Sequence, residues 1–360
     1  MAVSEALNPM GTDGFEFVEY TAPDQKGIND LKVLFCHMGF AEIGKHKHKE
    51  VWLYRQGDVN FIVNGELAQQ SQAESFAKQH GPSVNAMAFR VKDAVHALKH
   101  AVANGAKVCP PQSGPMELNI PAIYGIGDSY LYLVDRYGSE NIYSVDFDFY
   151  PDWQERVTRN DAGLGVIDHL THNVDIGQMD KWAGFYERIA NFREIRFFDI
   201  EGRHTGLKSR AMTAPCGKIR IPINESSDDK SQIAEYLNEY NGEGIQHIAL
   251  TTDNIYETVR KLKEKGMVFM DTPDTYYEKV NDRVAGHQEN VDELKELRVL
   301  IDGDERTGIL LQIFTDTVIG PVFFEIIQRK GNDGFGEGNF QALFESIELD
   351  QIRRGVLDDA

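Results

Sequence analysis

The chain has 360 residues, more than a single hydrophobic core usually organises, so two domains or one duplicated domain are expected. Its content of 41% hydrophobic and 26% charged residues is that of an ordinary soluble globular protein. The formal net charge of −20 and the lack of a long apolar run or a signal-peptide pattern predict a cytoplasmic protein that binds neither nucleic acid nor a membrane.

A pattern of strand, polar turn and amphipathic helix occurs four times along the chain. The copies begin with GFEFVEYTAPD, GPSVNAMAF, GVIDHLTHNVD and GEGIQHIAL, near residues 14, 81, 165 and 244. In the second and fourth copies the helix stripes are expected at Val95, Leu98 and Val102 and at Ile255, Val259 and Leu262. Each of these two helices is followed by a glycine suited to a left-handed C-cap. The chain is therefore a repeat of four similar modules.

Further strands complete each module and set the expected domain limits. Paired strands are expected in VWLYRQGDVNFIVN, in LYLVDRYGSENIYSVDF and in GILLQIFTDTVIGPVFFEIIQ. The polar stretch 151–164, in which we expect little helix, forms the boundary between the halves. We expect an α+β fold of four βαβββ modules, with an N-terminal domain over 12–150, a linker over 151–164 and a catalytic domain over 165–333. A C-terminal helix is expected over 334–356.

Three polar residues occupy corresponding places on strands of the second half. Side chains alternate along a strand, so His169 shares a face with Ile167 and Thr171, whereas Asp168 and His172 lie on the opposite face. His247 and Glu325 likewise lie among apolar neighbours. A lone buried histidine is more often a satisfied core residue than a ligand, but two imidazoles and a carboxylate that converge can satisfy one another through a metal.

The first half lacks this set of ligands. Alignment of the modules places Ala86 opposite His247, Tyr143 opposite Glu325, and Val18 or Glu19 opposite His169. We therefore expect a scaffold without a metal site in the first half and the functional site in the second.

Two histidines and one carboxylate, without a cysteine, are typical of the facial triad of non-haem Fe(II) oxygenases. Zn(II) could take the same ligands and act as a Lewis acid. Gln312 and Phe314 share a strand face near this site. The tail GNDGFGEGNFQALFESIELDQIRRG is typical of a glycine-rich hinge followed by an amphipathic helix. One interpretation is a helix that only docks on the core. The other is that Phe335 and Phe340 also form an aromatic gate that keeps water from the site.

These motifs carry a resemblance that runs almost from end to end. With GFEFVEY, YLVDRYG, RIPINES, PDTYYE, LLQIF, GPVFFEIIQRKG and GFGEGNFQALFESIE, the sequence resembles the bacterial type of the 4-hydroxyphenylpyruvate dioxygenase family, in the vicinal-oxygen-chelate superfamily. The resemblance implies two open-barrel domains, a homo-oligomer (dimer or tetramer), and Fe(II) held by His169, His247 and Glu325. It also implies catalytic roles for Gln232, Gln246, Gln312 and Phe340, and substrate binding by Ser209, Pro222, Asn224, Phe314, Phe335, Asn339 and Phe344.

The activity implied by the resemblance is conversion of 4-hydroxyphenylpyruvate and O2 to homogentisate and CO2 in tyrosine and phenylalanine catabolism. 4-Hydroxymandelate synthase, which is similar and uses the same ligands and substrate, is the alternative. An extradiol ring-cleaving dioxygenase shares the ligand set but is disfavoured by the GFGEGNF tail. A metal-free binding protein on the same scaffold is a further alternative that a metal assay would decide.

Overall fold

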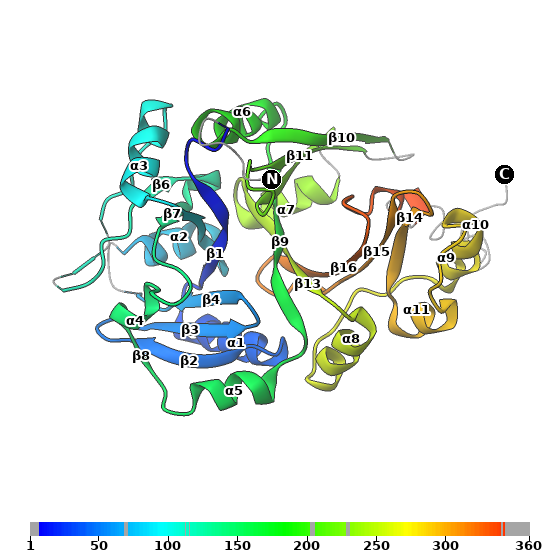
Figure 1. Cartoon of the computed structure of the whole chain (residues 1–360), viewed down its shortest axis with the longest axis horizontal. Coiled ribbons are helices and arrows are strands. Elements are labelled where there is room, and N and C mark those ends of the chain that lie inside the picture. Colours follow the sequence, from blue (N-terminus) through cyan, green and yellow to red (C-terminus); the bar gives the residue numbers. More distant parts are fainter. Residues whose placement is uncertain are drawn as a thin grey trace.

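The computed structural model describes residues 7–67, 71–111, 113–114, 116–201, 206–227, 231–339 and 341–342. Two curled sheets are built from the two halves of the chain, and the half formed by the earlier residues lies on the left of Figure 1. In the described part of the chain, no helix is long and apolar enough to cross a membrane.

The first sheet takes eight strands of the described chain: β1 (Thr12–Thr21), β2 (Ala41–His46), β3 (Val51–Gln56), β4 (Val59–Asn64), β5 (Ser83–Val91), β6 (Ala122–Tyr124), β7 (Tyr130–Val134) and β8 (Phe147–Phe149). Their order in the sheet is β6-β7-β5-β1-β4-β3-β2-β8. The connecting helices are α1 (Gln25–His37), α2 (Gln72–His80), α3 (Ala94–Ala103) and α4 (Tyr143–Asp146).

The second sheet contains β9 (Leu164–Val174), β10 (Arg193–Glu201), β11 (Gly206–Thr213), β12 (Arg220–Ser226), β13 (Gly244–Thr252), β14 (Leu300–Asp304), β15 (Gly308–Phe314) and β16 (Phe323–Lys330). Their order is β10-β11-β12-β9-β13-β16-β15-β14. The helices of this half are α6 (Met179–Ala190), α7 (Gln232–Tyr240), α8 (Ile255–Glu264), α9 (Asp274–Glu278), α10 (Val280–Arg283) and α11 (Val291–Leu297).

The two strand orders match when one is reversed, which confirms the duplicated α+β fold. β1, β5 and β7 occupy the places of β9, β13 and β16, and β4, β3 and β2 occupy those of β12, β11 and β10. The second module departs from the others, because α4 follows β7 and the next strand, β8, pairs with β2 at the far edge of the sheet.

Two predictions about local structure are wrong. The expected strand in GSENIYSV is the short helix α4, since the Asn141 side chain accepts a hydrogen bond from Ser144 N at 3.1 Å and starts a helical turn. The stretch expected to be poor in helix contains α5 (Trp153–Asn160), whose apolar stripe has only two residues, Trp153 and Val157, both partly buried against the core of the first half.

The stripe expected on α3 is also wrong, whereas the one on α8 is confirmed. Ile255, Val259 and Leu262 are all buried. On α3 the buried residues are Ala94, Ala97 and Ala101, while Val95 and Val102 are exposed. A face of alanines lets this helix approach its neighbours closely, and of the three expected residues only Leu98 is partly buried against the core.

One hydrophobic core joins the two halves. Phe324 on β16 lies within aromatic contact of Tyr20, Phe35 and Phe61 from the first half, with ring centroids 5.9–6.5 Å apart. Gln56 ties the halves together at the main chain, because its side-chain oxygen accepts hydrogen bonds from Ala162 N and Leu164 N. The second sheet, which carries the predicted site, is thus packed against the aromatic core of the first half.

Candidate metal centre

The three predicted metal ligands lie on adjacent strands at the middle of the second sheet. His169 on β9 and Glu325 on β16 both pair with Ala249 of β13, two residues beyond His247. His169 Nε2 lies 3.2 Å from Glu325 Oε2, His247 Nε2 lies 3.4 Å from the same oxygen, and the two Nε2 atoms are 3.4 Å apart. Three ligand atoms that share one face of an octahedral metal ion, each about 2.1 Å from the ion, lie about 3 Å from one another. The observed spacing of these three atoms therefore suits a single ion.

Burial and mutual charge leave these side chains ready to bind a cation. Burial lowers the pKa of His247, which favours its neutral form. Burial alone would raise the pKa of the Glu325 carboxyl, but the two histidines outweigh it and hold that pKa at about 2. For His169, burial lowers the pKa, and the carboxylates of Glu325 and Asp168 reverse the shift and raise it. A carboxylate facing two imidazoles is the donor set that a divalent ion such as Fe(II) or Zn(II) takes.

Each histidine is oriented by the residue before it, and in both cases that residue sits in a β-bulge. The pairing of β9 with β13 skips Asp168 on one strand and Gln246 on the other. Asp168 Oδ1 lies 2.7 Å from His169 Nδ1, and Gln246 Oε1 lies 3.0 Å from His247 Nδ1. Because an oxygen faces each Nδ1, that nitrogen carries the proton and Nε2 keeps its lone pair for a metal.

Asp168 connects the metal centre to the tail. Arg329 donates to both of its oxygens, from Nε at 2.8 Å and from Nη2 at 2.7 Å. Arg220 adds a contact at 3.3 Å. Burial would raise the pKa of Asp168, but Arg329 and His169 outweigh it and hold that pKa far below its ordinary value. Nη1 of Arg329 donates to the carbonyls of Asn332 and Gly334 in the glycine-rich hinge.

A second chain of hydrogen bonds runs from Glu325 outward. Gln312 Nε2 donates to Glu325 Oε1 at 3.3 Å, and Asn339 Nδ2 donates to Gln312 Oε1 at 2.8 Å. Tyr276 Oη donates to Asn339 Oδ1 at 2.6 Å. Gly336 leaves room for the Gln312 amide, because a Cβ on this residue would lie 1.6 Å from Gln312 Oε1. The hinge and the carboxylate ligand are therefore linked through two amides.

Aromatic rings surround the ligands. The Phe335 ring meets the His169 ring edge to face at a centroid distance of 5.3 Å, and Phe323 stacks on His247 at 4.9 Å. Phe314 contacts both Phe323 and His247. These rings make the surroundings of the ligands apolar, which strengthens electrostatic interactions there.

Of the remaining predicted site residues, three lie together on neighbouring strands, one lies on an exposed helix turn, and two fall outside the described part of the chain. Ser209 and Asn224 are direct partners on β11 and β12, and Pro222 lies two residues before Asn224. Gln232 lies at the first turn of α7 with its side chain exposed, and no described contact connects it to the metal ligands. Phe340 and Phe344 lie outside the described residues.

The structure corrects the counterparts that the sequence assigned in the first half. Phe17 pairs with Ala88 as His169 pairs with Ala249, and Tyr132 pairs with Ala88 as Glu325 pairs with Ala249. The counterpart of His169 is therefore Phe17, not Val18 or Glu19. The counterpart of Glu325 is Tyr132, because Tyr143 lies in the helix α4.

Sequence reasoning missed several residues beside the ligands. Asp168 was assigned to the opposite strand face, and only a bulge brings it to His169. Thr171 Oγ1 lies 3.0 Å from His247 Nε2. Asn173, fully buried next to Asn224, has no hydrogen-bond partner for either side-chain atom within the described residues. Of these residues, only Thr171 could have been found from the sequence, because strand alternation places it on the same face as His169. His172 points away and bonds to Tyr186 Oη at 2.7 Å, as its strand face predicted.

Comparison with known proteins identifies the family. Residues 7–148 match the model "Hydroxyphenylpyruvate dioxygenase, HPPD, N-terminal", and residues 166–285 match "Glyoxalase/Bleomycin resistance protein/Dioxygenase superfamily". The chain is 65% identical to a protein of Pseudomonas aeruginosa named 4-hydroxyphenylpyruvate dioxygenase, over 99% of both chains. The chain belongs to the 4-hydroxyphenylpyruvate dioxygenase family.

Two further similarities fit this family. A protein of Vibrio vulnificus named Hemolysin VllY is 70% identical, over 99% of both chains. Among solved structures, a mutant of 4-hydroxymandelate synthase from Streptomyces coelicolor is 26% identical, with a TM-score of 0.79, and the match covers 95% of this chain and 99% of that one. The predicted vicinal-oxygen-chelate fold is confirmed, and the relatives named as dioxygenases are much closer in sequence than the synthase.

Proposed function

We propose that this chain converts 4-hydroxyphenylpyruvate and O2 to homogentisate and CO2, with Fe(II) held by His169, His247 and Glu325. The observation that carries the proposal is the convergence of these three ligand atoms within 3.2–3.4 Å in a chain of this family. When bound, Fe(II) would supply positive charge for the 2-oxo acid and a path by which electrons of the substrate reach O2.

The protein's own residues would orient and shield the reactants. Asp168 and Gln246 accept the Nδ1 protons and fix both imidazole rings, and the Gln312 amide fixes the carboxylate of Glu325. Phe314, Phe323 and Phe335 would exclude water from the reacting atoms.

The substrate pocket is proposed on Ser209, Pro222, Asn224, Gln246, Gln312, Phe314, Phe335 and Asn339. Support comes from the sheet register, which places Ser209 and Asn224 side by side with Asn173 on strands next to the metal ligands. Roles for Gln232, Phe340 and Phe344, the domain limits, the gating helix, the cytoplasmic location and a homo-oligomeric state stay predictions.

Product analysis tests the proposal. The purified chain is reconstituted with Fe(II) and ascorbate, supplied with 4-hydroxyphenylpyruvate in air, and the products are separated by chromatography. Homogentisate supports attack on the ring. Hydroxymandelate would keep the fold and metal site but identify the chain as a 4-hydroxymandelate synthase, and the lack of oxygen uptake with iron bound would contradict a dioxygenase.

A further inference from the structure

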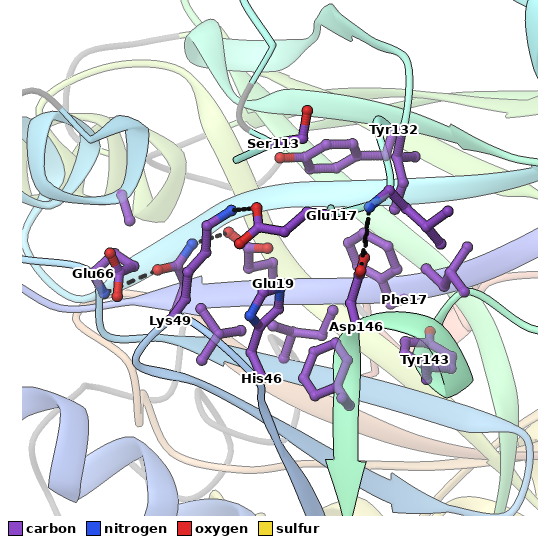
Figure 2. A pocket seen from close by; sticks show the side chains of 18 of the residues that line it. Phe17, Glu19, His46, Lys49, Glu66, Ser113, Glu117, Tyr132, Tyr143 and Asp146 are labelled. Carbon is purple, nitrogen blue, oxygen red and sulfur yellow. Dashed lines mark hydrogen bonds and ion pairs between the residues drawn. The ribbon is translucent and has the colours of Figure 1, made fainter. Parts of the chain in front are cut away.

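A second cavity lies in the first half of the chain, away from the metal centre. It has a volume of about 290 Å3, close to the lower end of the roughly 300–1,000 Å3 typical of small-molecule sites. Figure 2 shows Glu19 near its middle, with Lys49, His46 and Glu117 around it and Phe17 and Tyr132 nearby. The sequence predicted only a scaffold in this half.

The cavity occupies the place in the first sheet that the metal centre and proposed substrate pocket occupy in the second. Both sheets carry bulges at equivalent positions, at Glu16 and Asp168 and at Asn85 and Gln246. With this register, six residues of the cavity correspond to His169, Thr171, Ser209, Pro222, Asn224 and Glu325; in the same order they are Phe17, Glu19, Val51, Ile62, Asn64 and Tyr132. The two halves thus share the concave face but differ in the side chains at the positions of the proposed metal ligands.

Glu19 is the distinctive group in this cavity. Its side chain stands where Thr171 stands in the second sheet, and the residue is only 7% exposed. Asn64 Nδ2 and Asn85 Nδ2 both donate to Oε1, at 2.8 and 2.6 Å. No hydrogen bond from the described residues reaches Oε2. A buried carboxylate satisfied on one oxygen alone is costly, so it favours a partner that donates to the other.

The surroundings indicate the charge of that partner. The ion pair of Lys49 is with Glu117, at 2.6 Å, so the Lys49 charge is offset by Glu117 and acts on Glu19 only from a distance. Burial lowers the pKa of His46, which favours its neutral form. Glu66 and Asp146 add acidic groups to the lining. Burial raises the pKa of Glu19 and outweighs the opposite effects of its two amide donors and of the charge on Lys49.

We propose that this cavity binds a small organic cation, a protonated primary amine or amidine on an aromatic or aliphatic body, with Glu19 as its counter-ion. An ammonium or amidinium group donates to Oε2 and replaces the lost hydration of the carboxylate. The rings of Phe17 and Tyr132, with centroids 5.6 Å apart, supply apolar contact and cation–π attraction. An inorganic cation fits less well, since no three histidine, cysteine or acidic ligands of the described chain converge in this cavity.

The test measures binding to the full-length, iron-loaded protein by isothermal titration calorimetry. The probes are 2-phenylethylamine, benzamidine and n-butylamine, with 2-phenylethanol as a neutral control and Mg²⁺ as an inorganic one. We expect at least one of the three cations to bind once per chain. Its affinity falls at least about tenfold in Glu19→Gln, which keeps the shape and the acceptor for the two asparagines but removes the charge.

Two further variants make the result specific. Asp148→Asn removes the same charge from an exposed site on β8 that does not line the cavity, and its affinity stays within about threefold of the parent. Val51→Phe fills the cavity and abolishes binding without any change of charge. The proposal is overturned if no amine or amidine binds, if 2-phenylethanol binds as tightly as 2-phenylethylamine, if Glu19→Gln retains full affinity, or if Mg²⁺ alone binds in a way that depends on Glu19.

Discussion

Replacement of Asp168 by asparagine tests whether this carboxylate positions a metal ligand. The carboxylate accepts from His169 Nδ1 and Arg329 Nη2 on one oxygen and from Arg329 Nε on the other, all at 2.7–2.8 Å. Asparagine has the same shape but offers one acceptor and one donor. Whichever way the amide turns, an N–H group faces an N–H group of His169 or of Arg329.

The size of the effect follows from these two contacts. If the amide nitrogen faces His169, the imidazole moves its proton to Nε2 and loses the lone pair that binds metal. Loss of such an outer partner costs roughly 10–100-fold in metal affinity, or about 1.4–2.7 kcal/mol. If it faces Arg329 instead, a buried ion pair is broken at a cost on the order of 3 kcal/mol in folding free energy, reduced because Arg329 also bonds to two carbonyls of the hinge.

The assay separates the two outcomes. Metal affinity is measured by competition with a chelator on the Co(II)-substituted protein, whose visible spectrum reports the donor set, and the free energy of unfolding is measured in urea. Asp333→Asn is the matched control, since Asp333 is 84% exposed and touches the same basic cluster through Arg220 at 3.5 Å. The reasoning is refuted if Asp168→Asn keeps both its metal affinity within about threefold and its stability within about 0.5 kcal/mol of the parent.

Three further variants test other parts of the site. His247→Ala should abolish metal binding and turnover together, and metal analysis that finds a loaded, active variant would contradict the ligand assignment. Gly336→Ala should displace Gln312 and lower the homogentisate formed per O2 consumed. Gly331 also has a positive φ, but a Cβ there would meet no atom closer than 3.5 Å, so Gly331→Ala should preserve this ratio. Burial lowers the pKa of His172 to about 3, so below about pH 6.5 the unfolded state binds a proton that the folded state does not, and the free energy of unfolding decreases by up to about 1.4 kcal/mol for each unit by which the pH is lowered. His172→Gln should make the free energy of unfolding, measured by urea titration at about pH 4.5–7, depend less steeply on pH. An unchanged slope would show that His172 is not its cause.

The sequence was sufficient for the features that depend on periodicity. Alternation along a strand placed His169, His247 and Glu325 on one face and His172 on the other, and the structure agrees. The repeat of strand and helix likewise predicted the duplicated fold. Both signals rest on patterns that run over many residues, where one irregular position changes little.

Features that depend on one residue were missed. A bulge adds a residue to one strand without a mark in the apolar pattern, so Asp168 was assigned to the wrong face and Phe17 was not recognised as the counterpart of His169. Tyr143 was matched to Glu325 because GSENIYSV resembles a strand in composition, but a side-chain bond from Asn141 starts a helix there.

The paired bulges explain how two halves with one backbone can serve different ligands. In each half a bulge lies at equivalent residues of one strand, Gln246 on β13 and Asn85 on β5. The Gln246 side chain bonds to His247, whereas the Asn85 side chain bonds to Glu19. The same backbone device holds a metal-binding imidazole in one half and a carboxylate in the other. Because the main chain supplies the geometry, a difference of a few side chains separates the proposed triad of metal ligands in the second half from the single buried carboxylate of Glu19 in the first.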